Sequence, residues 1–242
     1  MDVTVNVVGD GGSPTGPYIE YTSLDSSGRV FTAKFRGTVV PEYAFAYLAE
    51  LTSVDMPDNV IAIGDNGFYR CPKLQLASLP SGLTSIGDFA FLNCYQLSMV
   101  TLPSGITSIG QYAFNNCPRL ALTSLPSGIT SLPTAAFQYC PKLALTTFPS
   151  GMTSIGAYAF RQGTGLASIT LPPALTTIGD FAFANCTGLE TVKFTSTVSS
   201  IPNGVFSGCT KLSTIYVPWS QGQVANAPWG ANNATIIYDY TD

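Results

Sequence analysis

The sequence predicts a solenoid, a fold in which short repeated coils stack along one axis, and three observations indicate it. Eight phenylalanines follow one another at intervals of 23 residues without an insertion: Phe45, Phe68, Phe91, Phe114, Phe137, Phe160, Phe183 and Phe206. Six residues after each of them stands a leucine, and twelve residues after stands a proline in seven of the eight repeats. Self-similarity at a fixed period of this length is typical of stacked repeat architectures. We take the recurring phenylalanine as position zero of its coil, count the other positions from it, and number the coils one to eight from Phe45 to Phe206.

Further apolar positions recur in every coil. Position eleven is Met, Leu, Phe or Val, position fifteen is usually aliphatic, and position eighteen is nearly always Ile or Leu. One repeat is too short to bury so many apolar side chains by itself, whereas stacked copies bury them against each other. We therefore expect one elongated domain in which equivalent side chains form continuous internal columns.

The spacing Leu97-x-x-Val100-x-Leu102-Pro103 resembles the strand segment of a leucine-rich repeat, and Ile86-Gly87-x-x-Ala90-Phe91-x-x-Cys94 resembles the BspA-type variety of that family. The resemblance covers roughly residues 38–221. It implies an α/β repeat, a right-handed leucine-rich-repeat solenoid of eight 23-residue coils. Parallel strands would line its concave face, short helical turns its convex face, and β caps its two ends.

The glycine at position nineteen is expected to open each helical turn, and the Asp or Gln that often follows suits the positive end of that turn. The glycines concerned are Gly64, Gly87, Gly110, Gly156 and Gly179. Pro133 and Pro202 replace them in two coils, which the first turn of a helix tolerates.

The ends of the chain depart from the period. Residues 1–8 alternate apolar and polar side chains, as a strand does, and the Gly- and Pro-rich residues that follow up to 17 indicate a linker. Such a strand could pair with a second copy of the chain, attach to a partner such as a virion, or simply dock loosely. We divide the rest into a capping hairpin over 18–37, the solenoid over 38–221 and a C-terminal cap over 222–242.

Two tryptophans, Trp219 and Trp229, belong to the C-terminal end. Either they cover the last coil as lids, or they contribute to a ligand site.

Six cysteines all occupy position three, and Leu48 and Gly163 take that position in the other two coils: Cys71, Cys94, Cys117, Cys140, Cys186 and Cys209. This register favours a column of small buried thiols, since free Cys behaves as a small hydrophobe. Disulfides and a metal site are the alternatives, although parallel side chains disfavour the bond and the chain has no His as a further ligand. We expect neither a metal nor a cofactor.

Composition narrows the classes of partner. Only 10% of residues are charged and the net charge is −4, which argues against nucleic acid, because that partner requires a basic face. No apolar run reaches transmembrane length, so we expect no membrane insertion. Residues 1–8 lack the basic start and long apolar core of a secretory signal.

A candidate ligand-binding set follows from the strand positions expected to face outward on the concave sheet. Position ten is a hydroxyl-rich row through the middle of the chain, with Thr101, Ser124 and Thr147. Position eight carries a large apolar residue in four consecutive coils: Leu76, Met99, Leu122 and Leu145. We take these seven residues as the candidate set.

Position nine leaves two interpretations of the apolar row open. It is Ala or Thr in three of these four coils but aliphatic elsewhere. Either the strand is rotated locally and position eight points inward, or the four residues form an exposed apolar stripe, which commonly marks an interaction site.

Two other rows complete the pattern. Aromatic residues recur two positions before the phenylalanine, where they either pack over the turn or form a ladder for a glycan or protein: Tyr43, Phe89, Tyr112, Tyr158 and Phe181. Basic residues recur at position five, where we expect a solvated edge: Lys73, Arg119, Lys142 and Lys211.

Nothing in the sequence indicates an enzyme. There is no His, the carboxylates are scattered, and no nucleophile, phosphate-binding or metal-ligand motif is present. The resemblance implies microbial surface proteins that bind host proteins, matrix or other cells. We therefore expect a non-catalytic recognition or adhesion scaffold for a protein or glycan on a cell surface, acting outside the cell. The alternatives are a phage or prophage virion protein, tail-associated and attached through its N-terminus, and a structural spacer or consensus-like engineered sequence.

Overall fold

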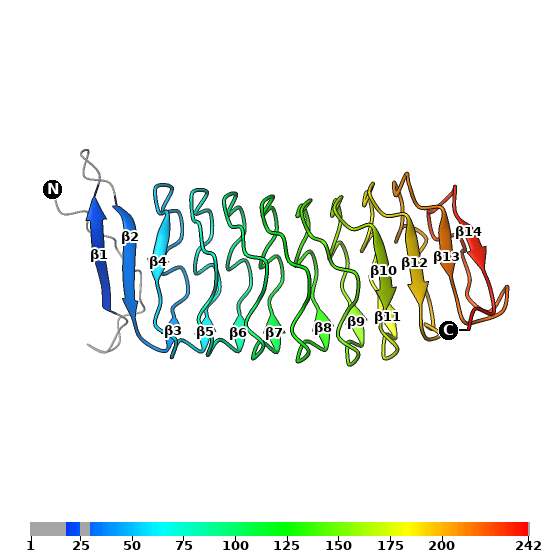
Figure 1. Cartoon of the computed structure of the whole chain (residues 1–242), viewed down its shortest axis with the longest axis horizontal. Helices are drawn as coiled ribbons and strands as arrows, with labels where there is room; N and C mark the ends of the chain where they lie inside the picture. Colours follow the sequence, from blue (N-terminus) through cyan, green and yellow to red (C-terminus); the bar gives the residue numbers. More distant parts are fainter. Residues whose placement is uncertain (1–17, 25–29, 242) are drawn as a thin grey trace.

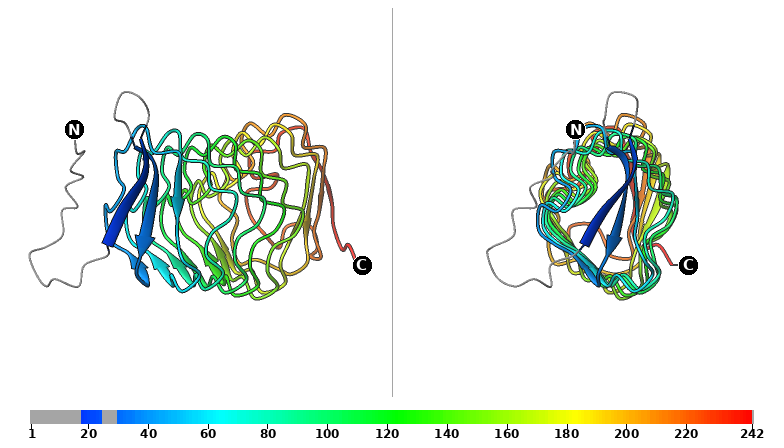
Figure 2. Two further views of the ribbon diagram at one scale, coloured as in Figure 1. Left: turned by 60° about the vertical axis from the view of Figure 1, so that its left-hand side comes forward. Right: turned by 90° about the vertical axis from the view of Figure 1, so that its left-hand side faces the viewer.

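The computed structural model describes residues 18–24 and 30–241, and these residues form a single stack of coils along one axis (Figure 1). Viewed down that axis, successive coils superimpose as one closed ring (Figure 2). The predicted solenoid is therefore confirmed. The strand predicted over residues 1–8, its linker up to residue 17, and any attachment through them lie outside the described residues. No described segment is a helix long and apolar enough to cross a membrane.

The strands of the solenoid lie on two of its sides. Positions eight to eleven form what we call the long-strand face, and positions sixteen to nineteen the short-strand face. Strands on the long-strand face, with the two capping strands before them, are β1 (Tyr18–Leu24), β2 (Val30–Arg36), β4 (Ser53–Asp55), β10 (Ser168–Leu171), β12 (Thr191–Phe194), β13 (Thr214–Tyr216) and β14 (Thr235–Ile237). Strands on the short-strand face are β3 (Val39–Val40), β5 (Ala62–Ile63), β6 (Ser85–Ile86), β7 (Ser108–Ile109), β8 (Ser131–Leu132), β9 (Ser154–Ile155) and β11 (Thr177–Ile178).

Equivalent residues pair between coils in parallel. On the long-strand face Thr191 pairs with Thr214, 23 residues later, and on the short-strand face Ile63 pairs with Ile86. The pairing period thus equals the sequence period, as a solenoid requires.

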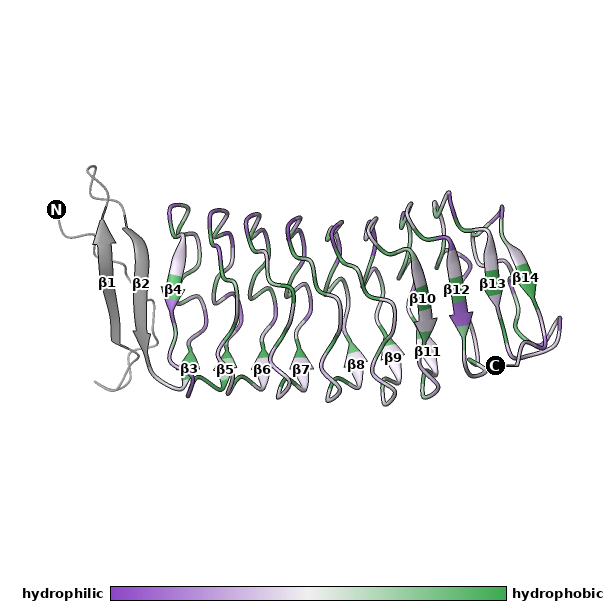
Figure 3. Ribbon diagram, viewed as in Figure 1, coloured by the Kyte–Doolittle hydropathy of each residue, from purple (hydrophilic) through white to green (hydrophobic). Residues whose placement is uncertain are grey.

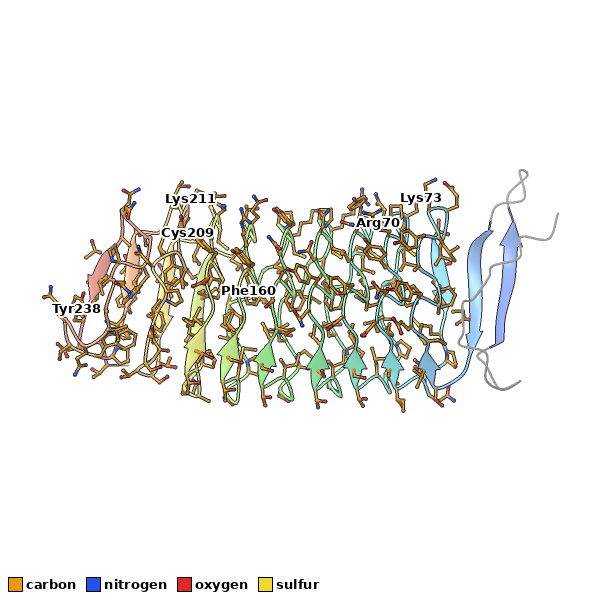
Figure 4. All side chains as sticks on the ribbon, turned by 180° about the vertical axis from the view of Figure 1, so that it is seen from behind. Arg70, Lys73, Phe160, Cys209, Lys211 and Tyr238 are labelled. Carbon is orange, nitrogen blue, oxygen red and sulfur yellow. The ribbon has the colours of Figure 1, made fainter. Side chains whose placement is uncertain are left out.

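The phenylalanines form the expected internal column. All eight rings are fully buried, and neighbouring ring centroids lie 4.9 to 5.9 Å apart with interplanar angles of 3° to 22°. Rings at this distance contribute about 0.5–1.5 kcal/mol per pair beyond the area that they bury. Figure 4 shows Phe160 inside the stack.

The cysteines form a second column, which confirms the prediction of buried thiols. All six are free and buried. Each Sγ donates a hydrogen bond to the carbonyl oxygen of the phenylalanine in the preceding coil, as from Cys71 to Phe45 at 2.9 Å and from Cys140 to Phe114 at 3.0 Å. Burial raises the pKa of the Cys71 and Cys140 thiols to about 12. These thiols are therefore neutral packing groups at physiological pH, not nucleophiles.

The helical turns expected on the convex side are absent from the described residues, so that part of the prediction is wrong. A chain of tight turns takes their place, with residues two before and two after the phenylalanine at positive φ, such as Phe89 at 56° and Asn93 at 63°. A positive φ at the third residue is the mark of a type II turn. Alternate N–H groups close these turns within the coil, as Leu92 N to Phe89 O at 3.1 Å, or donate to the next coil, as Phe91 N to Ala113 O at 2.7 Å. The backbone thus bonds partly between coils, whereas an α-helix would use every N–H within its own segment.

The glycines at position nineteen have a different role from the predicted one. A Cβ on Gly156 would lie 2.6 Å from the Pro133 carbonyl carbon and 2.7 Å from the Thr134 nitrogen of the preceding coil. Glycine therefore lets consecutive coils approach closely. Its N–H also extends the ladder, as from Gly156 to the Leu132 oxygen at 2.8 Å.

Proline at position nineteen interrupts the short-strand face. The sheet β3-β5-β6-β7 ends at β7, and β8 begins a second sheet with β9 and β11. Pro133 follows β8 directly and has no N–H to donate to the Ile109 oxygen. Pro202 stands at position nineteen of the coil that follows β11, and the second sheet ends at β11.

At both ends of the solenoid, paired residues lie 21 positions apart in the sequence, two fewer than the 23 of the repeats. The antiparallel hairpin β1–β2 pairs with β4 in parallel, with Thr32 opposite Ser53, and at the other end Thr214 of β13 pairs with Thr235 of β14. Trp219 and Trp229 are both buried, and their rings lie 5.1 and 6.1 Å from the Phe194 ring. The interpretation of the tryptophans as lids is therefore confirmed.

Candidate functional site

The four large apolar residues at position eight are buried. Leu76 is 5% exposed, Met99 and Leu122 are 0% exposed, and Leu145 is 1% exposed. The prediction that they form an exposed stripe is therefore wrong, and the alternative in which position eight points inward is the arrangement observed. They belong to the hydrophobic core and offer no surface to a ligand.

Position nine explains the rotation. In coils two to five the side chains of Ala77, Val100, Thr123 and Thr146 face solvent. In coils six to eight Ile169, Val192 and Ile215 are buried at this position, and the polar residue at position eight faces outward or lies half-buried. Because one of the two positions must fill the core, the larger apolar side chain turns inward and its neighbour turns out.

The rotation turns two residues outward in each middle coil. Position ten is exposed in coils two to five as well, so positions nine and ten present adjacent side chains to solvent. We call this area the widened surface; its residues are Ala77, Ser78, Val100, Thr101, Thr123, Ser124, Thr146 and Thr147. The candidate hydroxyls Thr101, Ser124 and Thr147 all lie on it. With a strand spacing of about 4.8 Å, four coils extend it over about 15 Å.

The widened surface combines hydroxyl groups with small apolar groups. Val100, at 55% exposure, is its most prominent apolar side chain. A shallow depression of about 200 Å³ borders it, lined by Ser78, Leu79, Ser81, Thr101, Leu102, Pro103 and Ser104. Sequence reasoning missed Val100, although the large residue beside it, Met99, was the available signal.

Charge is confined to the margins of this area. Position ten carries Asp55 in coil one and Lys193 in coil seven, and positions eight to ten of coils two to five carry no charged residue. Protein interfaces commonly have this arrangement, with charged residues depleted at the centre and polar groups at the rim.

The surface offers contacts but no group suited to proton transfer at neutral pH. Its side chains are hydroxyls, methyls and a valine, and none of them titrates near that pH. Within residues 18–24 and 30–241, no three His, Cys, Asp or Glu side chains gather where they could hold a metal ion. The geometry therefore supports binding as the chemistry of this face.

The aromatic row two positions before the phenylalanine packs over the turns. Phe89 stacks on Tyr112 with centroids 5.1 Å apart, and Tyr158 stacks on Phe181 at 5.6 Å. The Phe181 ring occupies the space that a Cβ on Gly204 would need. Stacking covers ring faces within these two pairs, and non-aromatic residues interrupt the row in three coils, so it provides no continuous stacking platform.

The family model described as the BspA type leucine rich repeat region, in six copies, matches residues 38–152 and 132–227. Among solved structures, a leucine-rich repeat protein of T. pallidum is similar with a TM-score of 0.52 and 24% sequence identity, over 78% of this chain and 86% of that chain. A leucine-rich repeat protein of Bacteroides ovatus aligns with a TM-score of 0.49 and 21% identity, over 91% of this chain and 77% of that chain. No curated protein matches the sequence. The T. pallidum likeness shows the fold and nothing of the ligand.

Proposed function

The chain belongs to the BspA-type leucine-rich repeat family, and we propose that it is a non-catalytic recognition scaffold that binds a partner through the widened surface. Leucine-rich repeats generally serve as interaction scaffolds, which supports the class of function. The partner that we propose is a protein or glycan on a cell surface.

One observation carries the choice of face. In coils two to five a pair of small or hydroxyl-bearing residues turns outward in every coil, so eight such side chains stand on a backbone fixed by buried columns. A rigid surface loses little conformational entropy on binding, which favours recognition. Val100 supplies an apolar contact within it, and the hydroxyls supply hydrogen bonds to a partner.

A charge introduced at this surface tests the proposal. Val100→Asp and Thr123→Asp place a carboxylate on exposed positions, so the fold is retained, but a partner would have to bury that charge. Ser108→Asp is the matched control, since Ser108 is exposed on the short-strand face. We expect the labelled wild-type chain and S108D to bind intact bacterial or epithelial cells, or spots of a glycan array, and V100D and T123D to lose most of that binding. Equal binding by all four proteins would refute the assignment of the face.

A further inference from the structure

The basic residues of the solenoid gather along one edge. Between residues 38 and 221 the sequence has seven Lys and Arg, and six of them fall at positions one to five of their coils. We call them the basic edge: Arg70, Lys73, Arg119, Lys142, Arg161 and Lys211. The acidic residues of the same range lie elsewhere on the coil, except for Glu50. The chain is acidic as a whole, yet this edge carries a local excess of positive charge.

The structure places these residues along one side of the molecule. Figure 4 shows Arg70, Lys73 and Lys211 on the same edge, at both ends of the solenoid. The loops along this edge are largely hydrophilic (Figure 3). Arg119, Lys142 and Lys211 are exposed at position five of coils four, five and eight. Their charges therefore line up parallel to the solenoid axis.

Most of this charge is available to a ligand. Lys73 forms an ion pair with Glu50 at 2.7 Å, and among the described residues it is the one member of the basic edge with such a pair. Arg70 lies over the rings of Tyr47 and Tyr69, and Arg161 over the ring of Tyr158, with distances of 5.3 to 6.0 Å to the centroids. A cation held on an aromatic face keeps its outward N–H groups for a second partner.

The side chains between the charges are amides and tyrosines. At position two, Asn116 Nδ2 donates to Asn93 Oδ1 of the preceding coil at 2.8 Å, which fixes both amides. The large apolar residues exposed on this edge are tyrosines, with Tyr47 at 59% and Tyr95 at 42% exposure. Amides bond hydroxyl groups, and tyrosine rings contact the apolar faces of sugars.

We infer that the basic edge binds an anionic polysaccharide laid along the solenoid axis. A linear row of cations on a rigid stack fits a polymer that repeats its carboxylates or sulfates along an extended chain. The amides and tyrosines fit the uncharged part of the same polymer, its hydroxyls and ring faces. An acidic protein segment would gain from the charges but would find no exposed aliphatic patch for its side chains.

The electrostatics set the expected salt dependence. The net charge of −4 repels a polyanion at long range, so binding depends on the local field of the edge. Exposed charges further apart than the Debye length, about 8 Å at physiological ionic strength, are largely screened. Affinity should therefore fall steeply as salt is added.

Titration of the full chain with dextran sulfate, and with neutral dextran as the uncharged comparison, tests the inference. The double variant Arg119→Gln/Lys142→Gln removes two adjacent charges, and Lys193→Gln removes a charge from the long-strand face as the matched control. We expect the wild type and K193Q to bind dextran sulfate alike, and the double variant to bind about tenfold more weakly, as two exposed charge contacts allow. Neutral dextran should not bind. V100D should bind dextran sulfate like the wild type, which separates this site from the widened surface.

Three results would overturn the inference. The double variant could bind dextran sulfate as tightly as K193Q does. The affinity of the wild type could be independent of salt. Poly-L-glutamate could bind at least as tightly as dextran sulfate through the same residues, which would identify an acidic protein segment as the occupant.

Discussion

Coils two to five and coils six to eight share a period and a core but cross the long-strand face differently. In coils six to eight, β10, β12 and β13 pair in a regular parallel ladder with Ile169, Val192 and Ile215 inward. In coils two to five no strand is formed on that face, and a single bridge between Thr147 and Thr170 joins the two regions. The columns of phenylalanine and cysteine continue through both.

The 23-residue period therefore does not determine which residue at positions eight and nine fills the core. A slip of one position exchanges the inward and outward side chains. Leu122 beside Thr123 places leucine inside, and Thr191 beside Val192 places valine inside, so burial of the larger apolar group decides.

Coil three shows that neighbours also matter. Met99 and Val100 are both apolar, yet Met99 is 0% and Val100 is 55% exposed. The adjacent coils hold leucine inside at position eight, and inter-coil hydrogen bonds such as Ala121 N to Met99 O at 3.1 Å tie coil three to that arrangement. Because coil three shares the arrangement of its neighbours, Val100 is left exposed, and it lies on the surface that we assign to binding.

Truncation at position eight should separate the two regions most strongly. Leu122→Ala removes a fully buried side chain and should lower the free energy of unfolding by about 2–5 kcal/mol. Thr191→Ala, at the same position in coil seven, should change it by less than about 0.5 kcal/mol because Thr191 is only half-buried and polar. Urea unfolding of both variants measures the contrast. Equal losses would mean that position eight has the same environment in both regions.

An exchange of the two residues tests whether their identity sets the arrangement. Leu122→Thr alone should destabilise the chain, and Thr123→Val alone should change little. The double variant, which copies the Thr191–Val192 pair, should recover more than about 1 kcal/mol of the loss, since neighbouring residues couple on that scale. Hydrogen exchange should also show new protection of amides at this point of coil four. Purely additive effects would contradict local control by the pair.

Much of the fold could be predicted from the sequence, because each column occupies a fixed position in a period without insertions. The phenylalanine column and the thiol column required only that register. The helical turns could not be excluded in this way, since the bonding of alternate N–H groups to the next coil depends on the stack and not on local propensity. The recurrence of glycine at position nineteen could be seen in the sequence. Its reason, the close approach of Gly156 to the backbone of Pro133 and Thr134 in the preceding coil, depends on the stacking.

The candidate site was predicted less well for the same physical reason. The hydroxyls Thr101, Ser124 and Thr147 were placed correctly on the outside, because either rotation of the strand leaves position ten exposed. For the large residues at position eight both orientations were open, and the candidate set chose the exposed one, which their burial contradicts. The small partners at position nine supported the inward orientation that is observed. The sequence contained both alternatives, and burial in the stack decided between them.

Two glycines of coil five, Gly151 and Gly156, should differ in their tolerance of a side chain, because only Gly156 lies against the backbone of the preceding coil. Gly156→Ala should cost about 1–3 kcal/mol, because the new methyl group meets backbone atoms at 2.6 to 2.9 Å that cannot rotate away. Gly151→Ala meets nothing within 4 Å and should be neutral or stabilising by up to about 1 kcal/mol. Thermal or urea unfolding compares the two. A harmless G156A would show that the stack yields easily at position nineteen.

The thiol column runs through both regions, and its members Cys140 and Cys186, one from each region, should affect stability alike. Burial raises the pKa of the Cys140 thiol to about 12 and raises that of Cys186 in coil seven as well. An unfolded thiol ionises near its ordinary pKa of 9.0. Above that pH the unfolded chain therefore releases protons that the folded chain retains, and the free energy of unfolding falls as pH rises from 9 towards 12.

Cys140 and Cys186 should then each contribute a loss of about 0.8 kcal/mol at pH 9.5, and none well below pH 9. Cys140→Ala and Cys186→Ala should each reduce the difference in unfolding free energy between pH 7.5 and pH 9.5 by that amount, measured in urea with a reducing agent. The two variants should agree, because the Sγ atom donates to a phenylalanine carbonyl in both coils, to Phe114 and to Phe160. A pH dependence unchanged by either substitution would show that the thiols ionise as readily in the folded chain as in the unfolded one. A change for one variant alone would show that the thiol of that region is enclosed more tightly than the thiol of the other.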